Sequence, residues 1–133
     1  MPRRLSCLLP LVALLASACG GDGDGGTAPA TSRTARYEIS GTYSGHLTVV
    51  YATASGANQA TTVTSLPWSA DVTFAPGVAG AGIGAQSVPT QLGRPGQTAT
   101  VRIVVGGTAV QSTSGTTDAS GSVVLPTIAY VLR

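Results

Sequence analysis

Apolar and polar residues alternate with a period of two along most of the chain from Tyr37 onward, and this spacing places every second side chain on one face of a β-strand. The runs 47–51, 70–74, 101–105 and 128–132 each carry apolar residues at every second position. No window has sustained helical periodicity with caps, and the abundant Val, Ile and Thr disfavour helix further. The pattern therefore predicts an all-β domain.

Turn signals divide this region into short segments, for example Arg94-Pro95-Gly96 and Asp118-Ala119-Ser120-Gly121. The expected strands lie at residues 36–40, 45–54, 60–66, 69–75, 82–88, 98–106 and 122–132. Whether residues 108–112 add a short strand is left open by the pattern. About seven strands with turns roughly every 8–12 residues are typical of an immunoglobulin-like β-sandwich, with a small closed barrel as the alternative.

Two segments within this region invite a more specific interpretation. Trp68 is the only tryptophan, and we expect it at the start of a strand, where its large ring would fill the core. The segment GAGIG at 80–84 superficially resembles a phosphate-binding loop, but it lacks the GxGxxG spacing and no helix is expected after it. We therefore expect a flexible loop that leads into an edge strand.

The N-terminal residues follow a different pattern. Arg3 and Arg4 precede an apolar run of about ten residues, which suits a signal peptide and is too short to cross a bilayer. Small residues at 16–18 then precede Cys19. This order of basic tip, short apolar core, small residues and cysteine resembles a bacterial lipoprotein signal, in which the cysteine is acylated and becomes the new N-terminus.

We accordingly expect three regions: a signal peptide at 1–18, a lipidated flexible tether at 19–36 and a β-sandwich domain at 37–133. The tether has no large apolar residue, so it cannot bury enough surface to offset its ordering entropy. Ordinary secretion after cleavage near Ala18, or an uncleaved anchor, are the alternatives. The lipid would hold the protein in the cell envelope outside the cytoplasm. Since no aspartate directly follows Cys19, Gram-negative sorting rules favour the outer membrane.

Charge and cysteine usage narrow the choice of partners. The chain has seven arginines, no lysine and five acidic residues. Loss of a leader containing Arg3 and Arg4 leaves five arginines against five acids, with no basic run, which argues against nucleic acid. The two cysteines are Cys7, in the leader, and Cys19. The mature domain is therefore expected to have neither a disulfide nor a thiolate metal site.

Candidate catalytic groups are few. His46 is the only histidine, and a catalytic triad or a metal site would need companions beside it, so we expect a strand-surface residue. Glu38, Asp71 and Asp118 are far apart in sequence, and two of them would have to meet in space to act as a glycosidase pair. Asp118 is better suited to hold its turn. We expect no enzyme activity and no cofactor or metal.

Several blocks of this domain resemble, in order and spacing, the soluble domain of the MmpS family, small membrane proteins that accompany large RND-type lipid exporters in mycobacteria. The blocks are YEISG at 37–41, LTVVY at 47–51, SLPWS at 65–69, GAQ at 84–86 and VRIVVGG at 101–107. The resemblance implies an immunoglobulin-like β-sandwich and a non-enzymatic role in the export of lipids or siderophore-like molecules. It also implies contact with the periplasmic region of a transporter.

The most specific block contains Leu66, Pro67, Trp68 and Ser69, and the residues themselves favour a structural role for it. Pro67 suits the start of a strand, where its missing N–H costs least, and Trp68 supplies a large apolar surface. The chain departs from the family in three respects. It has a lipobox in place of an N-terminal transmembrane helix. It lacks the cysteine that the family often carries where Val101 stands and another near the end, and its tail at 122–132 differs.

The favoured function is a lipid-anchored, non-catalytic envelope protein that assists a process such as transport, with an RND-type transporter or another envelope protein as partner. A binding module for a hydrophobic small molecule is one alternative. A surface structural or adhesive domain, with exposed Thr and Ser faces and open edge strands, is another.

Overall fold

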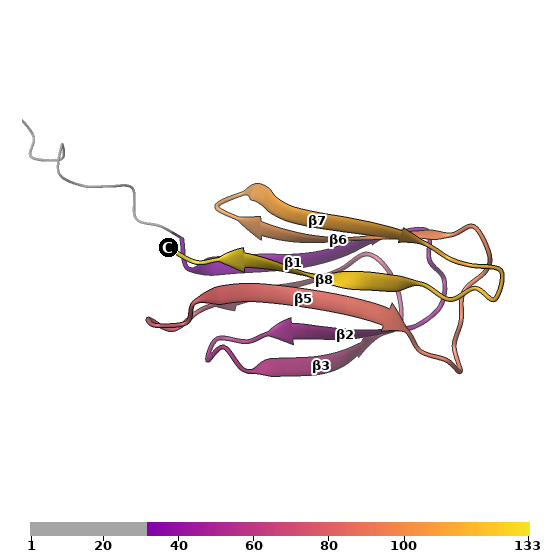
Figure 1. Ribbon diagram of the computed structural model, residues 1–133, viewed down its shortest axis with the longest axis horizontal. Helices are drawn as coiled ribbons and strands as arrows, with labels where there is room; N and C mark the ends of the chain where they lie inside the picture. The colour runs from indigo at the N-terminus through magenta and orange to yellow at the C-terminus, as the bar shows by residue number, and fades with distance from the viewer. Residues whose placement is uncertain (1–31) are drawn as a thin grey trace, which may run out of the picture. The chain divides into compact units, whose positions relative to one another are not determined.

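A computed structural model describes residues 32–133 of the chain and contains eight strands in two four-stranded antiparallel sheets (Figure 1). The strands are β1 Thr34–Gly41, β2 Leu47–Ala52, β3 Asn58–Val63, β4 Trp68–Thr73, β5 Gly80–Ser87, β6 Thr98–Val105, β7 Thr108–Thr116 and β8 Val124–Val131. The predicted all-β sandwich is confirmed. Among the described residues, no helix is long and apolar enough to cross a bilayer.

Sheet A has the order β4-β1-β6-β7, and sheet B has the order β3-β2-β5-β8. Each sheet keeps two edge strands, so the two stack as separate layers. Only the β2–β3 and β6–β7 hairpins connect neighbours within a sheet, and every other connection crosses between the layers. In the constant-type immunoglobulin arrangement the first strand pairs with the second, whereas here β1 lies between β4 and β6, so the likeness to that fold is one of architecture.

Three elements differ from the sequence-based expectation. β1 begins at Thr34, so residues 34–36 of the expected tether are paired with β4 and β6. β7 is a nine-residue strand, longer than the short segment left open near 108–112. The GAGIG segment is not a loop before an edge strand, because β5 begins at Gly80 and pairs with β2 on one side and β8 on the other. For β1 and β5, pairing with strands distant in the sequence overrides a weak local pattern, whereas β7 is held extended by its hairpin with β6.

The core lies between the two sheets and is built from the inward positions of the alternation. The residues that β1, β2 and β6 bury completely are Ala35, Tyr37, Ile39, Leu47, Val49, Ala99, Val101 and Ile103. The predicted inward faces of 47–51 and 101–105 are thus confirmed. Complete burial of a large apolar side chain stabilises the fold by about 1.5–3 kcal/mol, so these central strands contribute much of the stability.

Tyr37 joins the two sheets through its hydroxyl. Its side chain rises from β1 of sheet A, and the hydroxyl donates to the Ala52 carbonyl at 2.9 Å and accepts from the Gly82 N–H at 3.2 Å, both in sheet B. The pairing of β2 with β5 ends at Tyr51 and Ile83, so this hydroxyl serves backbone groups where the two strands stop bonding each other. Burial raises the pKa of Tyr37 above its ordinary value of 10.0.

Trp68 does not fill the centre of the core, contrary to expectation. It is half-buried at the start of β4, and its ring lies 5.8 Å from that of Tyr51 at an interplanar angle of 57°. The Tyr51 ring lies 5.4 Å from that of Tyr37. Because β4 is an edge strand, its first residue reaches only the margin of the core, and Tyr37 on a central strand takes the interior position instead.

A second buried hydroxyl network joins the loop before β2, the end of β5 and the turn before β8. The Tyr43 hydroxyl donates to Ser87 Oγ at 2.8 Å. Ser87 Oγ accepts from the Val123 N–H at 2.8 Å and donates to the Val123 carbonyl at 3.2 Å. A Cβ at Gly93 would come within 2.6 Å of a Tyr43 ring carbon, so this loop needs glycine there. The network ties the loop before β2 to the junction of β5 and β8, where the Ser87 N–H also donates to the Val123 carbonyl at 2.9 Å.

Candidate interaction surfaces

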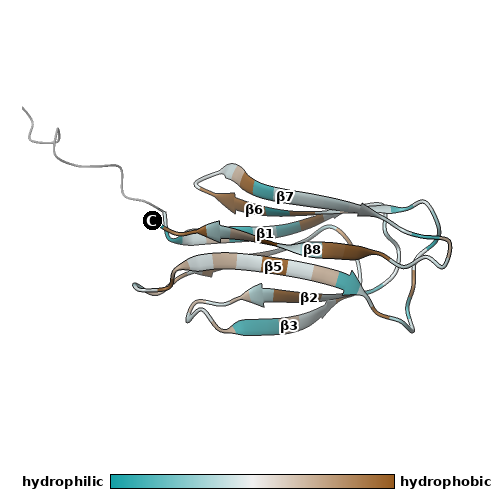
Figure 2. Ribbon diagram, viewed as in Figure 1, coloured by the Kyte–Doolittle hydropathy of each residue, from teal (hydrophilic) through white to brown (hydrophobic). Residues whose placement is uncertain are grey.

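The outer faces of the two sheets differ in charge. Every charged residue within a described strand, namely Arg36, Glu38, Asp71 and Arg102, lies in sheet A. The four strands of sheet B contain no Arg, Lys, Asp or Glu. Figure 2 shows brown and pale segments along most of β5 and β8, while the strongly polar parts of sheet B are the start of β3 and the end of β5.

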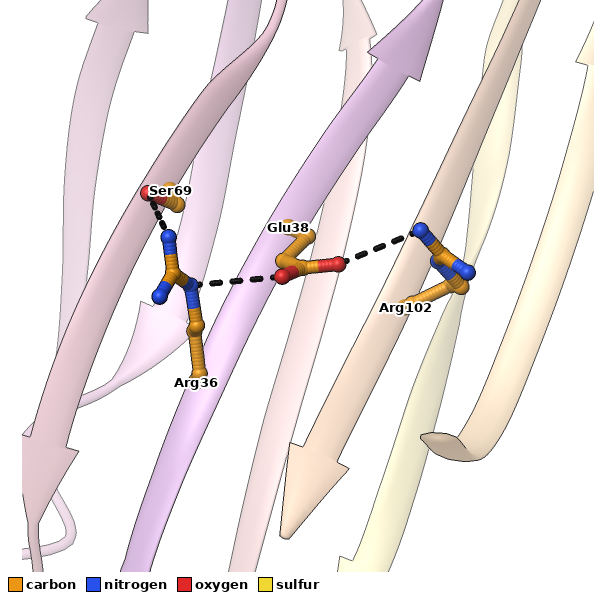
Figure 3. Close-up of polar contacts among 4 residues, drawn as sticks. All are labelled: Arg36, Glu38, Ser69 and Arg102. Carbon is orange, nitrogen blue, oxygen red and sulfur yellow. Dashed lines mark hydrogen bonds and ion pairs between the residues drawn. The ribbon is translucent and has the colours of Figure 1, made fainter. Parts of the chain in front are cut away.

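An ion-pair ladder crosses three strands of sheet A (Figure 3). Arg36 Nε lies 3.2 Å from Glu38 Oε1, and Arg102 Nη2 lies 3.3 Å from Glu38 Oε2. Arg36 Nη2 also donates to Ser69 Oγ at 3.2 Å, which extends the ladder from β1 to β4. The side chains of Arg36 and Arg102 are 51% and 45% exposed, so each pair contributes at most about 1 kcal/mol. The ladder mainly favours one register of β1 between its neighbours.

Two of the three candidate carboxylates come near each other on this face. Glu38 lies opposite Ser69 across the β1–β4 pair, and Asp71 is two residues further along β4. Arg36 lies directly opposite Asp71 and also bonds Glu38. Each carboxylate therefore faces an arginine in a charge-balanced group, whereas a glycosidase needs two carboxyl groups that flank a substrate.

The block formed by Leu66, Pro67, Trp68 and Ser69 makes the crossing from β3 to β4, that is, from sheet B to sheet A. Leu66 packs against the core, and the peptide bond between Leu66 and Pro67 is cis. Trp68 also packs against the core, whereas Ser69 points outward to the ladder. Pro67, Trp68 and Ser69 line a shallow hollow of about 250 Å³ beside the ladder. Each of the four residues thus has a structural place in the crossing.

Asp118 holds the turn between β7 and β8. Its Oδ1 accepts from the Ser120 hydroxyl at 2.6 Å, from the Ser120 N–H at 2.9 Å and from the Ser122 N–H at 3.1 Å. These hydrogen bonds, that of the Ser120 hydroxyl foremost, hold the pKa of Asp118 below its ordinary value of 3.8. The predicted turn role is confirmed.

His46 lies in the loop just before β2, one residue outside the strand on which it was expected. The residue is half-buried, and its backbone N–H donates to the Gln91 carbonyl at 2.8 Å. Within residues 32–133, no group of three His, Cys, Asp or Glu side chains is placed to hold a metal ion. The fixed feature of His46 is its backbone, which ties this loop to the segment after β5.

Three glycines line the outer face of β5, which is one of the two central strands of sheet B. Gly80, Gly82 and Gly84 occupy alternate positions of β5, and the buried side chains of Ala81 and Ile83 point inward between them. A Cβ at Gly82 would meet nothing closer than the Ile128 carbonyl oxygen, at 3.6 Å. Space alone therefore does not require glycine at position 82.

Exposed valines flank this glycine row. Val50 on β2 is 42% exposed, and Val124 and Val131 on β8 are 66% and 69% exposed. The register places Val50 opposite Gly84 and Val131 opposite Gly80. A hollow of about 310 Å³ beside Gly84 is lined by Val50 and Val124 and also by the polar residues Thr48, Gln86 and Thr127. We call the glycine row and the three valines the valine–glycine face.

Sequence reasoning did not find this face, although a signal was present. Glycine stands at every second position of an alternating apolar run, which within a central strand leaves one face bare, and the segments that form sheet B carry no charge. Cys19, the predicted lipidation site, lies outside the described residues. No protein-family model matches the chain, and no curated protein matches it.

Proposed function

We propose that this protein is a lipid-anchored, non-catalytic β-sandwich of the cell envelope, attached to its membrane through Cys19. The observation that carries the proposal is the order of residues at the N-terminus, where Arg3 and Arg4, a short apolar run and three small residues precede the cysteine. One acyl chain holds a protein only marginally, so durable attachment needs the two or more chains that lipobox cysteines receive.

The geometry of the domain supports a role in contact. Its buried hydroxyls are engaged in structural hydrogen bonds, those of Tyr37 between the sheets and those of Tyr43 and Ser87 at one end. Glu38, the central carboxylate of sheet A, bonds two arginines. A body of this kind offers surfaces to a partner, and we infer that it assists an envelope process without making or breaking bonds.

Metabolic labelling with a fatty-acid analogue tests the anchor, and the chain contains its own matched control. The wild type and Cys7→Ser are expected to carry the label and to sediment with membranes. Cys19→Ser is expected to lose both properties, because Cys19 is the only other cysteine. An unlabelled wild type, or equal labelling of the wild type and Cys19→Ser, would refute the proposed anchoring.

The resemblance of residues 37–111 to the MmpS family suggests the process in which this protein takes part. We propose an accessory role beside a transporter of the RND type, with the sandwich presented outside the cytoplasm. Affinity isolation from intact, detergent-solubilised membranes is expected to enrich such a transporter with the wild type and much less with Cys19→Ser. Repeated recovery of the protein without any envelope complex would contradict the partnership and leave the anchor untouched.

A further inference from the structure

We propose that the valine–glycine face binds the same face of a second copy of this chain. The face lies on β2, β5 and β8, and Ala60 continues its apolar surface onto β3. Ala60 on β3 lies opposite Val50 on β2, Val50 lies opposite Gly84 on β5, and Ala129 on β8 lies opposite Gly82. Large exposed apolar patches of soluble domains mark contact sites, and the three valines here flank a hollow that Thr48, Gln86 and Thr127 also line.

The absence of charge from the strands of sheet B favours a second copy as the occupant. A symmetric contact sets each group near its own equivalent, so a charged face would repel itself, as cross-strand like charges do. Sheet B contains no charged residue in any strand, whereas the outer face of sheet A carries Arg36, Glu38, Asp71 and Arg102. Of the two outer faces, that of sheet B is the one that can meet itself without ionic repulsion.

The relief of the face also suits a two-fold contact. Val124 and Val131 project from β8 at one edge, and the hollow beside Gly84 lies toward the middle. Rotation of a second copy about a two-fold axis can bring the edge valines of each copy over the glycine row of the other, so that the contact is made twice. The open space above Gly82 permits a close approach that a larger side chain would block, whereas Gly84 is buried beside the Thr127 side chain.

The size of the face sets the expected strength. Its four strands cover about 450 Å² per copy at ordinary strand spacing, whereas a stable interface buries about 800 Å² per partner. We therefore expect a weak dimer that is populated where copies are crowded. Attachment of every copy to one membrane would supply that crowding, and this step rests on the proposed anchor at Cys19.

Energy transfer between labelled copies of the full chain in lipid vesicles tests the dimer. The chain has no lysine, so Ala119→Lys in the exposed β7–β8 turn provides a side chain for donor or acceptor dyes away from both outer faces. Energy transfer is expected to rise with surface density and to fall when unlabelled chain is added. Val124→Arg is expected to weaken association at least about ten-fold, because it buries an unpaired charge in the contact.

Thr116→Arg is the matched control, since it adds the same charge at an exposed position of β7 at the edge of sheet A. It is expected to leave energy transfer unchanged, and Val131→Arg is expected to repeat the effect of Val124→Arg from a second exposed position. Equal transfer in all three variants, or no transfer above that of randomly distributed copies, would overturn the dimer. Loss of vesicle binding in Val124→Arg alone would overturn it too, because the face would then contact lipid.

The test separates the dimer from the anchor. If fatty-acid labelling fails, Cys19→Ser at high concentration in solution is still expected to associate, and Val124→Arg is still expected to prevent it. If Cys19→Ser abolishes association and Val124→Arg does not, then the membrane anchor, and not the valine–glycine face, brings the copies together.

Discussion

The outer faces of sheets A and B arise from the same period-two alternation and yet present different surfaces. On sheet A, Glu38 bonds Arg36 and Arg102, so the charges largely satisfy one another. On sheet B, the strands carry no charge, and Gly84 lies between exposed valines. A face whose polar groups are paired among themselves can remain in water, whereas a bare apolar face gains when it is covered.

The three glycines of β5 are expected to lower the stability of sheet B, and sheet A has no comparable row of glycines within one strand. Glycine within a strand is less favourable than alanine by about 0.5–1 kcal/mol, because it loses more backbone freedom on folding and packs no side chain. β5 accepts this cost at three outward positions of a central strand. The ladder on sheet A stabilises a register. On sheet B, Gly82 leaves room above the backbone, whereas a Cβ at Gly80 or Gly84 would come within 3.0 Å of the Tyr130 carbonyl oxygen or 2.6 Å of Thr127 Oγ1.

The largest effect is expected at Tyr37, whose hydroxyl links sheet A to sheet B. Tyr37→Ala should reduce the free energy of unfolding by about 3–5 kcal/mol, since it empties the centre of the core. Tyr37→Phe should cost about 1–3 kcal/mol, because it leaves the Ala52 carbonyl and the Gly82 N–H without their partner. Urea unfolding measures both. Tyr130→Phe is the control, and an equal loss in Tyr37→Phe and Tyr130→Phe would mean that the inter-sheet hydrogen bonds contribute nothing.

The glycine row can be tested next, at a position where space is available. Gly82→Ala is expected to raise the free energy of unfolding by about 0.5–1 kcal/mol, because the nearest atom to a new Cβ is at 3.6 Å. Gly84→Ala is the contrasting variant, since its Cβ would lie 2.6 Å from Thr127 Oγ1 and must displace that side chain. If thermal unfolding shows Gly82→Ala to be strongly destabilised, the fold and not a contact requires this glycine.

A smaller effect is expected on sheet A. Glu38→Gln should lower the free energy of unfolding by no more than about 1 kcal/mol, because the arginine of each ion pair is about half exposed to solvent. The difference between wild type and variant should shrink as salt is raised from low to about 1 M, where the Debye length falls to about 3 Å. Denaturation at the two salt concentrations measures it. A loss of several kcal/mol that salt does not change would make the ladder a principal support of the sandwich.

The smallest effect is expected at the turn that joins the two sheets between β7 and β8. The pKa of Asp118 is lowered in the folded state, so its contribution is present above the ordinary pKa of 3.8 and is lost as pH falls below that value toward the folded pKa. Asp118→Asn should reduce the fall in melting temperature between neutral and acidic pH, as measured by thermal unfolding at several pH values. Ala119→Ser keeps the carboxylate and should leave this fall unchanged. An identical fall in Asp118→Asn would show that this carboxylate does not link folding to pH.

Elements with a strong local period were predictable, and elements defined by a neighbour were not. The runs 47–51 and 101–105 show their buried faces in the sequence, because an apolar residue at every second position has few other ways to leave water. β7 is rich in Ser and Thr, and its edge pairing with β6 is what makes it a strand. Residues 80–84 read locally as a loop because glycine is a turn residue, and the ladders from β2 and β8 overrule that preference.

The candidate surfaces divide in the same way. The N-terminal pattern ending at Cys19 is read from the sequence alone, because processing enzymes recognise a short linear segment. The ladder of Arg36, Glu38 and Arg102 joins residues more than sixty positions apart, and only the pairing of β1 with β6 brings them together. Asp118 lies between these cases, since its turn is local and its predicted role is confirmed.

The amino-acid sequence by itself determined the all-β class, several of the turns and the residue pattern before Cys19 on which the proposed anchor rests, because each depends on residues within a few positions of one another. The tertiary structure decided the order of the strands, the central place of Tyr37 and the contrast between a charged and a bare outer face. These depend on which distant strands pair. That choice follows from the burial of the whole core, and no local window of sequence contains it.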